Sequence, residues 1–247
     1  MFQSNPFYMK IYGDYALFTD PMSKGGGEKF TYQVPTYQAI KGIIEAVYWK
    51  PTFVIYVDQI KVLNPIKTES KGLLFPPLIS SGSTQRVTHT YLKDVAYGVK
   101  FHFEWNEQFK QFSDDRNEIK HEQIMLRSMK KGGRRDIFLG VRECLGYISK
   151  LSEREYEELS TFQNGDISLG LMFHSFVYPR TFHESVEYEE DYLYSNFSPI
   201  IMSDGVITFC RPEECTISHQ LRKFGTKKDI QIKPVVDELN DYGEANV

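Results

Sequence analysis

The order of strand-like and helix-like segments in the first 150 residues is the feature that most constrains the fold. Alternating apolar and polar residues, rich in aromatic and β-branched side chains, predict four extended segments, at about residues 6–13, 53–63, 89–105 and 137–148. The segment 89–105 is long enough for one bent strand or for two strands. Helix-like segments at about 37–49 and 115–131 lie between them. The predicted order is therefore strand, helix, strand, strand, helix, strand.

The first helical segment has clear boundary signals. Thr36 follows Pro35 and has the hydroxyl that an N-cap residue needs, and the helix stops before Pro51. Between these limits, apolar residues recur at helical spacing, at Ile40, Ile43, Ile44 and Val47. We expect this stripe to pack into the core.

The predicted order is that of the split βαβ arrangement of a ferredoxin-like fold, the architecture of RRM domains. After a helix-prone acidic stretch at 152–160, the segments "DISLGLMFHSFVY" and "GVITF", with turns at "NGD" and "SDG", predict further antiparallel strands. We therefore predict an α+β protein with two domains. Residues 1–150 form the ferredoxin-like domain, and residues 151–247 form a smaller antiparallel β-sheet domain with a peripheral tail.

Composition excludes several classes of protein. The chain has 247 residues and no run of 18 apolar residues, and its start has no basic segment followed by an apolar one. We expect a cytoplasmic protein without a membrane partner. The three cysteines are too few for a disulfide framework, and "CRPEEC" (210–215) has only His219 close behind it, whereas His174 and His183 have no Cys partner at diagnostic spacing. We expect neither a metal nor a cofactor.

The net charge of −4 conceals a strongly basic segment. Residues 116–142 contain eight basic and three acidic side chains, a local net charge of +5. Such a patch on an acidic protein indicates one defined polyanion site. A glycine triplet next to Lys24 and the stretch "KKGGRRD" allow the backbone to approach phosphates, although a flexible loop and a solvated helix face are the simpler interpretations. The candidate RNA-binding residues are Lys24, Arg116, Arg127, Lys131, Arg134 and Arg135.

The second helix contains adjacent Lys120 and His121. At 100° per residue, its core face contains Ile119, Met125, Leu126 and Met129, and its basic face lies opposite, with His121 between the two faces. RNA carries its own nucleophile, because a base can take the proton of a 2′-hydroxyl, which then attacks the adjacent phosphate. Histidine can exchange protons near neutral pH, and Lys120 would supply positive charge or act as the acid. A surface or boundary histidine is the alternative.

Six motifs together resemble one known family. They are "GDYALFTDP", "GGEKFTYQVPTYQAIKGIIEAVYWKPT", "NPIKTESKG", "TYLKDVAYGVKFHFEWN", "DRNEIKH" and "KKGGRRDIFLGVRECLGYI". They resemble the CRISPR-associated protein of the Dvulg type, the repeat-processing endoribonuclease of the subtype I-C Cascade. The likeness covers about residues 6–215, and "FCRPEEC" departs by one residue from the expected "FPRPEEC".

This resemblance implies an activity and a set of site residues. It implies metal-independent cleavage of precursor CRISPR RNA at the base of the repeat hairpin, with a 2′,3′-cyclic phosphate on the upstream product. The protein would keep the 5′ handle of the crRNA and would join other Cascade subunits. The family's catalytic tyrosine, lysine and histidine match Tyr48, Lys120 and His121. Tyr48 would orient or activate the 2′-hydroxyl, Lys120 would stabilise charge and His121 would transfer protons as a general acid or base.

Two other interpretations stay open. The chain could be a non-catalytic subunit that binds the handle while another protein cuts the RNA. The same basic surface could also bind duplex DNA without sequence preference, and this affinity would fall steeply with salt.

Overall fold

The computed structural model of the protein describes residues 2–21, 23, 27–75, 85–107, 110–162, 165–178 and 192–223. In these ranges no helix is both long enough and apolar enough to cross a membrane. The predicted RNA-binding residue Lys24, His183 and the predicted tail at 225–247 lie outside the described residues.

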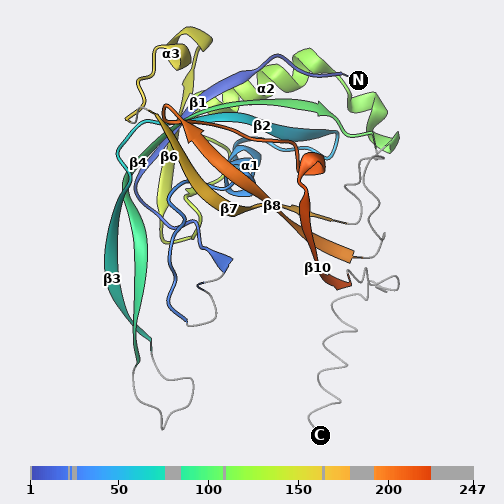
Figure 1. The fold of residues 1–247 in the computed structure, drawn as a ribbon. Helices are drawn as coiled ribbons and strands as arrows, with labels where there is room; N and C mark the ends of the chain where they lie inside the picture. Colours follow the sequence, from blue (N-terminus) through green and yellow to red (C-terminus); the bar gives the residue numbers. More distant parts are fainter. Residues whose placement is uncertain are drawn as a thin grey trace, which may run out of the picture.

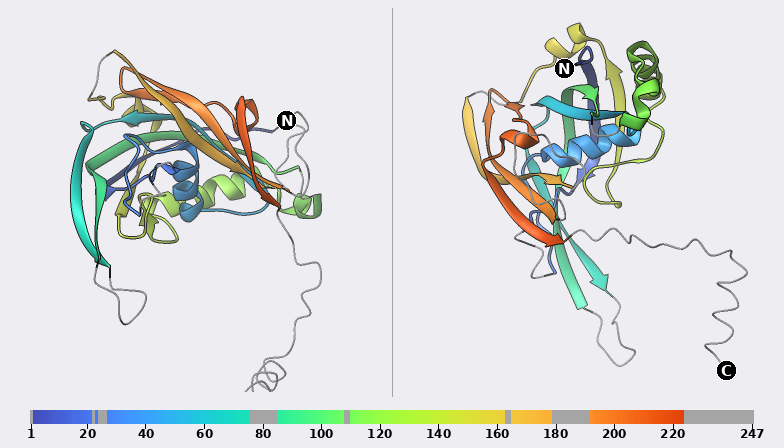
Figure 2. Two further views of the ribbon diagram at one scale, coloured as in Figure 1. Left: turned by 60° about the horizontal axis from the view of Figure 1, so that its bottom comes forward. Right: turned by 90° about the vertical axis from the view of Figure 1, so that its right-hand side faces the viewer.

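The N-terminal part has the predicted ferredoxin-like order. Its elements are β1 (Phe7–Ala16), α1 (Tyr37–Val47), β2 (Phe53–Val62), β4 (Gln85–Trp105), α2 (Glu118–Lys130) and β6 (Leu145–Leu151). The four strands lie side by side in the order β2-β4-β1-β6, and every neighbouring pair is antiparallel. Both helices pack on one side of this sheet (Figures 1 and 2). The predicted α+β fold class is confirmed.

The core lies between the sheet and the two helices because both contribute apolar faces. Alternate residues of β1, among them Met9 and Ile11, are fully buried on the helix side. The predicted stripe of α1 is also buried, with every member at most 4% exposed. The Thr36 hydroxyl accepts a hydrogen bond from the backbone N–H of Ala39, as expected for an N-cap.

The opposite face of the sheet is covered by α3 (Glu153–Glu157), in the stretch predicted to be helix-prone. Ser152 and Glu155 form a capping box at its start. Its Tyr156 is fully buried, and its ring packs at 5.0 Å against the ring of Tyr8, which projects from β1 on the side away from Met9. The sheet is therefore covered on both faces at this end.

The C-terminal strands continue the same sheet. They are β7 (Asp166–Val177), β8 (Tyr192–Ser203), β9 (Val206–Thr208) and β10 (Ile217–Lys223), with a short 3₁₀ turn, η3 (Pro212–Glu214), before β10. β9 pairs with β2, so that the order runs β10-β8-β9-β2-β4-β1-β6-β5, where β5 is the short strand Ile137–Phe138. The predicted "SDG" turn joins β8 and β9, and Asp204 and Gly205 both have positive φ, at 50° and 75°. The division at residue 150 stays a prediction.

Several strands differ from the sequence prediction. β3 (Lys67–Phe75) was not predicted, and it pairs with the first half of β4 in a hairpin that projects from the body of the molecule (Figures 1 and 2). The segment 89–105 forms a single long strand. The segment 137–148, predicted as one strand, is divided into β5 (Ile137–Phe138) and β6. Gly140 lies between them with φ of 91°, where a Cβ atom would meet the backbone of Leu17 at 2.1 Å.

Candidate active site

The ends of α1 and α2 position the candidate catalytic residues. α1 ends at Val47, and Tyr48 is its C-cap residue with extended backbone, although its N–H still donates to the carbonyl of Ile44. α2 begins after Asn117, whose side chain accepts a hydrogen bond from the N–H of Lys120. A 3₁₀ turn, η2 (Lys110–Asp115), precedes this cap. The predicted helix at 115–131 is therefore shorter at its start, and Asp115 lies outside it.

Tyr48 and His121 form a buried hydrogen bond. The Tyr48 hydroxyl oxygen lies 2.7 Å from Nδ1 of His121, and the two residues are 1% and 0% exposed. Nε2 of His121 lies 2.7 Å from the backbone carbonyl oxygen of Asp115. A carbonyl can only accept, so Nε2 carries a hydrogen, and in the neutral ring Nδ1 is then the acceptor. The Tyr48 O–H consequently donates to His121.

The burial of His121 corrects the predicted faces of α2. The buried residues of the helix are His121, Met125, Ser128 and Met129, whereas Ile119, which was expected in the core, is 72% exposed. Leu126 is only partly buried. The core-facing stripe starts with a histidine, and Ile119, the second residue of the helix, faces solvent. His121 thus lies inside the protein and not at the rim of the basic face.

Aromatic rings surround the imidazole of His121. Phe53 and Trp105 approach it edge-on, with ring centroids 5.3 and 5.8 Å away, and Phe103 lies at 6.4 Å. These rings come from β2 and β4, which are neighbouring strands of the sheet. Because such an apolar environment strengthens hydrogen bonds, it fixes the orientation of the histidine.

Lys120, next to His121 in the first turn of α2, points to the exposed side of the helix. There it forms an ion pair with Asp115. The Lys120 ammonium donates a short hydrogen bond to Oδ1 of Asp115, and the hydroxyl of Thr52 donates to Oδ2 at 2.9 Å. The hydrogen bonds from Lys120 and then from Thr52 lower the pKa of the Asp115 carboxyl group. Asp115 therefore stays ionised, and its carbonyl and carboxylate hold His121 and Lys120 together.

Arg134 covers the ring of Tyr48. Its guanidinium carbon lies 4.5 Å from the ring centroid, a cation–π contact, although the arginine itself is exposed. Burial raises the pKa of Tyr48, while the charge of Arg134 opposes this shift. Tyr48 therefore has a neutral hydroxyl near pH 7, which can donate one proton and accept another.

A family comparison identifies the group to which this chain belongs. The family described as CRISPR-associated protein (Cas_Cas5) matches residues 8–210. The chain belongs to the Cas5d family. This membership confirms the family named from the six sequence motifs, and the ferredoxin-like core lies almost entirely within the matched range.

Two individual proteins of this family are similar to the chain. The CRISPR pre-crRNA endoribonuclease Cas5d of Mannheimia succiniciproducens is 29% identical over 195 residues, which are 69% of this chain and 84% of that protein. The protein of the same name from Thermus thermophilus is 35% identical over 99 residues, 37% of this chain and 42% of that protein.

Two solved structures have the same fold. The crystal structure of a CRISPR-associated protein matches with a TM-score of 0.73 and 43% identity, covering 89% of this chain and 98% of that one. A functionally uncharacterized protein from Streptococcus mutans matches with a TM-score of 0.74 and 43% identity, covering 89% and 99% of the two chains.

The basic candidates of this Cas5d chain fall into two groups. Arg127 and Lys131 are exposed on the helix face that carries Lys120, and Arg135 is exposed just after the helix. Arg116 is partly buried, and its guanidinium bonds Glu107 and the backbone carbonyl of Asn106. The first group is free to bind a polyanion, while Arg116 also shapes the loop before α2.

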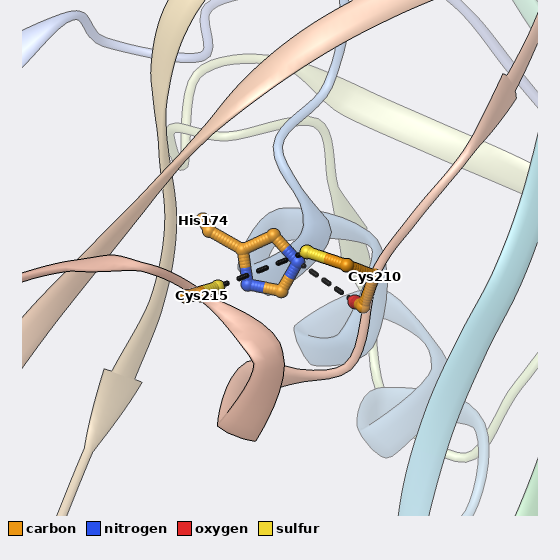
Figure 3. Close-up of side chains that lie close together, drawn as sticks. All are labelled: His174, Cys210 and Cys215. Atoms are coloured by element: carbon orange, nitrogen blue, oxygen red, sulfur yellow. Dashed lines mark hydrogen bonds between the residues drawn. The ribbon is translucent and has the colours of Figure 1, made fainter.

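Sequence reasoning missed two residues of the site and one group of side chains elsewhere. Asp115 and Thr52 gave no pattern signal, since their roles depend on the meeting of η2 and the start of β2. His174 was set aside because no cysteine lies near it in the sequence. In the structure it lies beside Cys210 and Cys215 (Figure 3), while His219 has its ring against Phe197 on β8.

Proposed function

We propose that this Cas5d chain is a metal-independent endoribonuclease that cuts precursor CRISPR RNA at the base of the repeat hairpin. It then keeps the 5′ handle as a subunit of a type I-C surveillance complex. Family membership and the name of the Mannheimia relative support RNA processing. The observation that carries the catalytic part is the hydrogen bond from Tyr48 to His121, beside Lys120 and an exposed basic helix face.

The RNA supplies the nucleophile of the reaction. The 2′-oxygen attacks the adjacent phosphorus while its proton passes to the Tyr48 oxygen, and the proton of Tyr48 passes to Nδ1 of His121. This relay lets a fully buried histidine act as the base. His121 becomes an imidazolium, and the Asp115 carboxylate, 3.5 Å from its Nε2, stabilises the new charge.

The leaving group and the developing charge require a cation. As the bond from phosphorus to the 5′-oxygen breaks, the Lys120 ammonium donates a proton to that oxygen and neutralises charge on the phosphorane. The upstream product then ends in a 2′,3′-cyclic phosphate. No step requires a metal ion, because side chains supply both proton transfers and the charge.

Arg134 couples RNA binding to the exposure of the Tyr48 hydroxyl. Tyr48 is buried and Arg134 lies over its ring, so we expect this side chain to move when RNA approaches the hydroxyl. Guanidinium groups bind phosphate in a bidentate manner. A phosphate next to the cut site would draw Arg134 off the ring and expose Tyr48, so that catalysis begins only on bound RNA.

The test is cleavage of the host's repeat RNA by the purified chain in excess EDTA. We expect one cut at the hairpin base, and no cut in a substrate with a 2′-deoxy nucleotide at that position. Cleavage of the deoxy substrate would overturn the 2′-hydroxyl mechanism. Tight binding without any cut would instead make the chain a handle-binding structural subunit.

A further inference from the structure

Three side chains that can bind a metal ion, one imidazole and two thiols, lie close together among the C-terminal strands. His174 lies on β7, Cys210 follows β9, and Cys215 is the C-cap residue of η3. One potential ligand atom from each residue lies within 4.8 Å of the others (Figure 3). His174 is 1% exposed, and the two cysteines are partly buried, so the group is partly shielded from solvent.

The spacing of the two sulfur atoms fits a shared metal ion. Cys210 Sγ and Cys215 Sγ are 3.9 Å apart. Two thiolates at about 2.3 Å from a tetrahedral zinc ion are separated by about 3.8 Å. A disulfide would instead require about 2.05 Å. The turn η3 between the cysteines holds this spacing, because Glu214 bonds back to the backbone N–H of Arg211.

The histidine can act as a ligand once its Nε2 gives up a hydrogen. This nitrogen lies 3.1 Å from the carbonyl oxygen of Cys210 and faces this cysteine in Figure 3, and because a carbonyl only accepts, Nε2 donates to it in the absence of an ion. A bound ion would replace that hydrogen, and the neutral ring would then carry its hydrogen on Nδ1. Nδ1 lies 3.0 Å from the hydroxyl of Ser175, and the ring stacks at 4.4 Å on Tyr37. Metal-binding histidines usually bond through their second nitrogen to such an outer partner, which fixes the ring. The Ser198 hydroxyl, 3.4 Å from Cys210 Sγ, is placed to support the thiolate.

We propose that His174, Cys210 and Cys215 bind one Zn²⁺ ion, with water as the fourth ligand. The ion would have a structural role, since it would join β7 to the turn η3. Hydrogen bonds also join this turn to the sheet. Arg211, at the start of the turn, donates to Glu104 on β4, and Asn196 on β8 donates to the carbonyl of Pro212 in the turn.

The proposed ion lies apart from the candidate active site. Tyr37, which stacks on His174, begins α1, and Tyr48 follows the end of this helix. The helix has 11 residues and is about 16 Å long. Zinc binding and RNA cleavage can therefore be tested separately.

Metal titration of the purified, reduced and metal-stripped chain tests the site. We expect one Co²⁺ per chain, with the sulfur-to-cobalt charge-transfer band and visible bands of a tetrahedral thiolate site, and displacement by Zn²⁺. Cys210→Ser and Cys215→Ser should each lose these bands. Cys144→Ser, which changes the third cysteine outside the group, should keep them.

A second measurement uses the wild-type chain, so its outcome does not depend on whether the cysteine variants fold. Zn²⁺ should slow thiol modification at Cys210 and Cys215, mapped by mass spectrometry, and should raise the melting temperature, with both effects reversed by EDTA. The proposal is overturned if no charge-transfer band appears, if the band persists in Cys210→Ser, or if Zn²⁺ leaves modification of both cysteines unchanged.

Discussion

His121 is a polar side chain at a position that the packing of α2 assigns to the core. Burial of a polar group is costly unless its hydrogen bonds are satisfied, and here both ring nitrogens have partners. An apolar side chain would fill the same space without needing them. The histidine therefore fits a chemical role better than a packing role, and Asp115 and Tyr48 fix its tautomer for accepting a proton from Tyr48.

Asp115 gives a prediction about stability against pH. Its carboxyl pKa is lower in the folded chain than in the unfolded chain. The ionised group therefore stabilises the fold above the unfolded value of about 3.9, and this contribution disappears as the pH falls through the folded pKa. Asp115→Asn removes the contribution at every pH. We expect the difference in unfolding free energy between wild type and this variant to be constant above about pH 5 and to shrink below about pH 4.

Urea unfolding across this pH range checks the prediction. Asp114→Asn, which changes the exposed neighbouring carboxylate, is the control and should not reproduce the pattern. A difference between wild type and Asp115→Asn that stays constant down to pH 2 would contradict the assignment of Lys120 and Thr52 as its partners.

Among the elements, the bounds and the buried face of α1 were predictable from the sequence, whereas for α2 only the helix end was. α1 has an N-cap and a regular apolar stripe, and both signals match its packing. In α2 the core-facing stripe contains His121 and Ser128, which no hydrophobicity pattern selects, while Ile119 faces solvent. The helix end was predictable, because Gly132 and Gly133 have φ of 85° and 107° and their N–H groups bond the carbonyls of Met129 and Ser128.

Glycine-to-alanine changes just past the end of α2 and inside α1 should have opposite effects on stability. Gly132 has space for a Cβ atom, but its positive φ disfavours alanine, so Gly132→Ala should lower the unfolding free energy by about 1 kcal/mol. Gly42, within α1, also has space and lies in a regular helix, so Gly42→Ala should raise it by about 0.4–1 kcal/mol. Chemical denaturation measures both values. Equal signs would contradict the described end of α2.

For the whole molecule, the ferredoxin-like core followed from the sequence, but the extent of the sheet did not. β8 contains Ser195, Asn196, Ser198 and Pro199, which weaken the strand pattern, and the side chains of Ser195, Asn196 and Ser198 are buried. β3 lies in a projecting hairpin, so that no buried face imposes an alternation. The pairing of β9 with β2 joins residues about 150 positions apart, and local patterns carry no information about it. The grouping of His174 with the two cysteines was hidden for the same reason.

The charge distribution of the whole molecule predicts how RNA binding depends on salt. The basic side chains of α2 lie on the face of the sheet opposite α3. If Arg135 binds one phosphate, Arg135→Gln should lower the slope of log binding constant against log salt by about 0.7–0.9. Arg154→Gln, which changes an arginine on α3 that is bonded to Glu158, should leave the slope unchanged. An unchanged slope in Arg135→Gln would show that the phosphates bind elsewhere.

The most direct test of the proton relay from Tyr48 to His121 is single-turnover cleavage of repeat RNA by wild type, Tyr48→Phe and Tyr37→Phe. Tyr48→Phe keeps the ring under Arg134 and removes only the hydroxyl that donates to His121. The relay predicts a loss of cleavage rate of about 10²-fold or more, with RNA binding within a few-fold of wild type. Tyr37→Phe, at the other end of α1, should cut at close to the wild-type rate. Cleavage by Tyr48→Phe at the wild-type rate would contradict the proton relay through Tyr48.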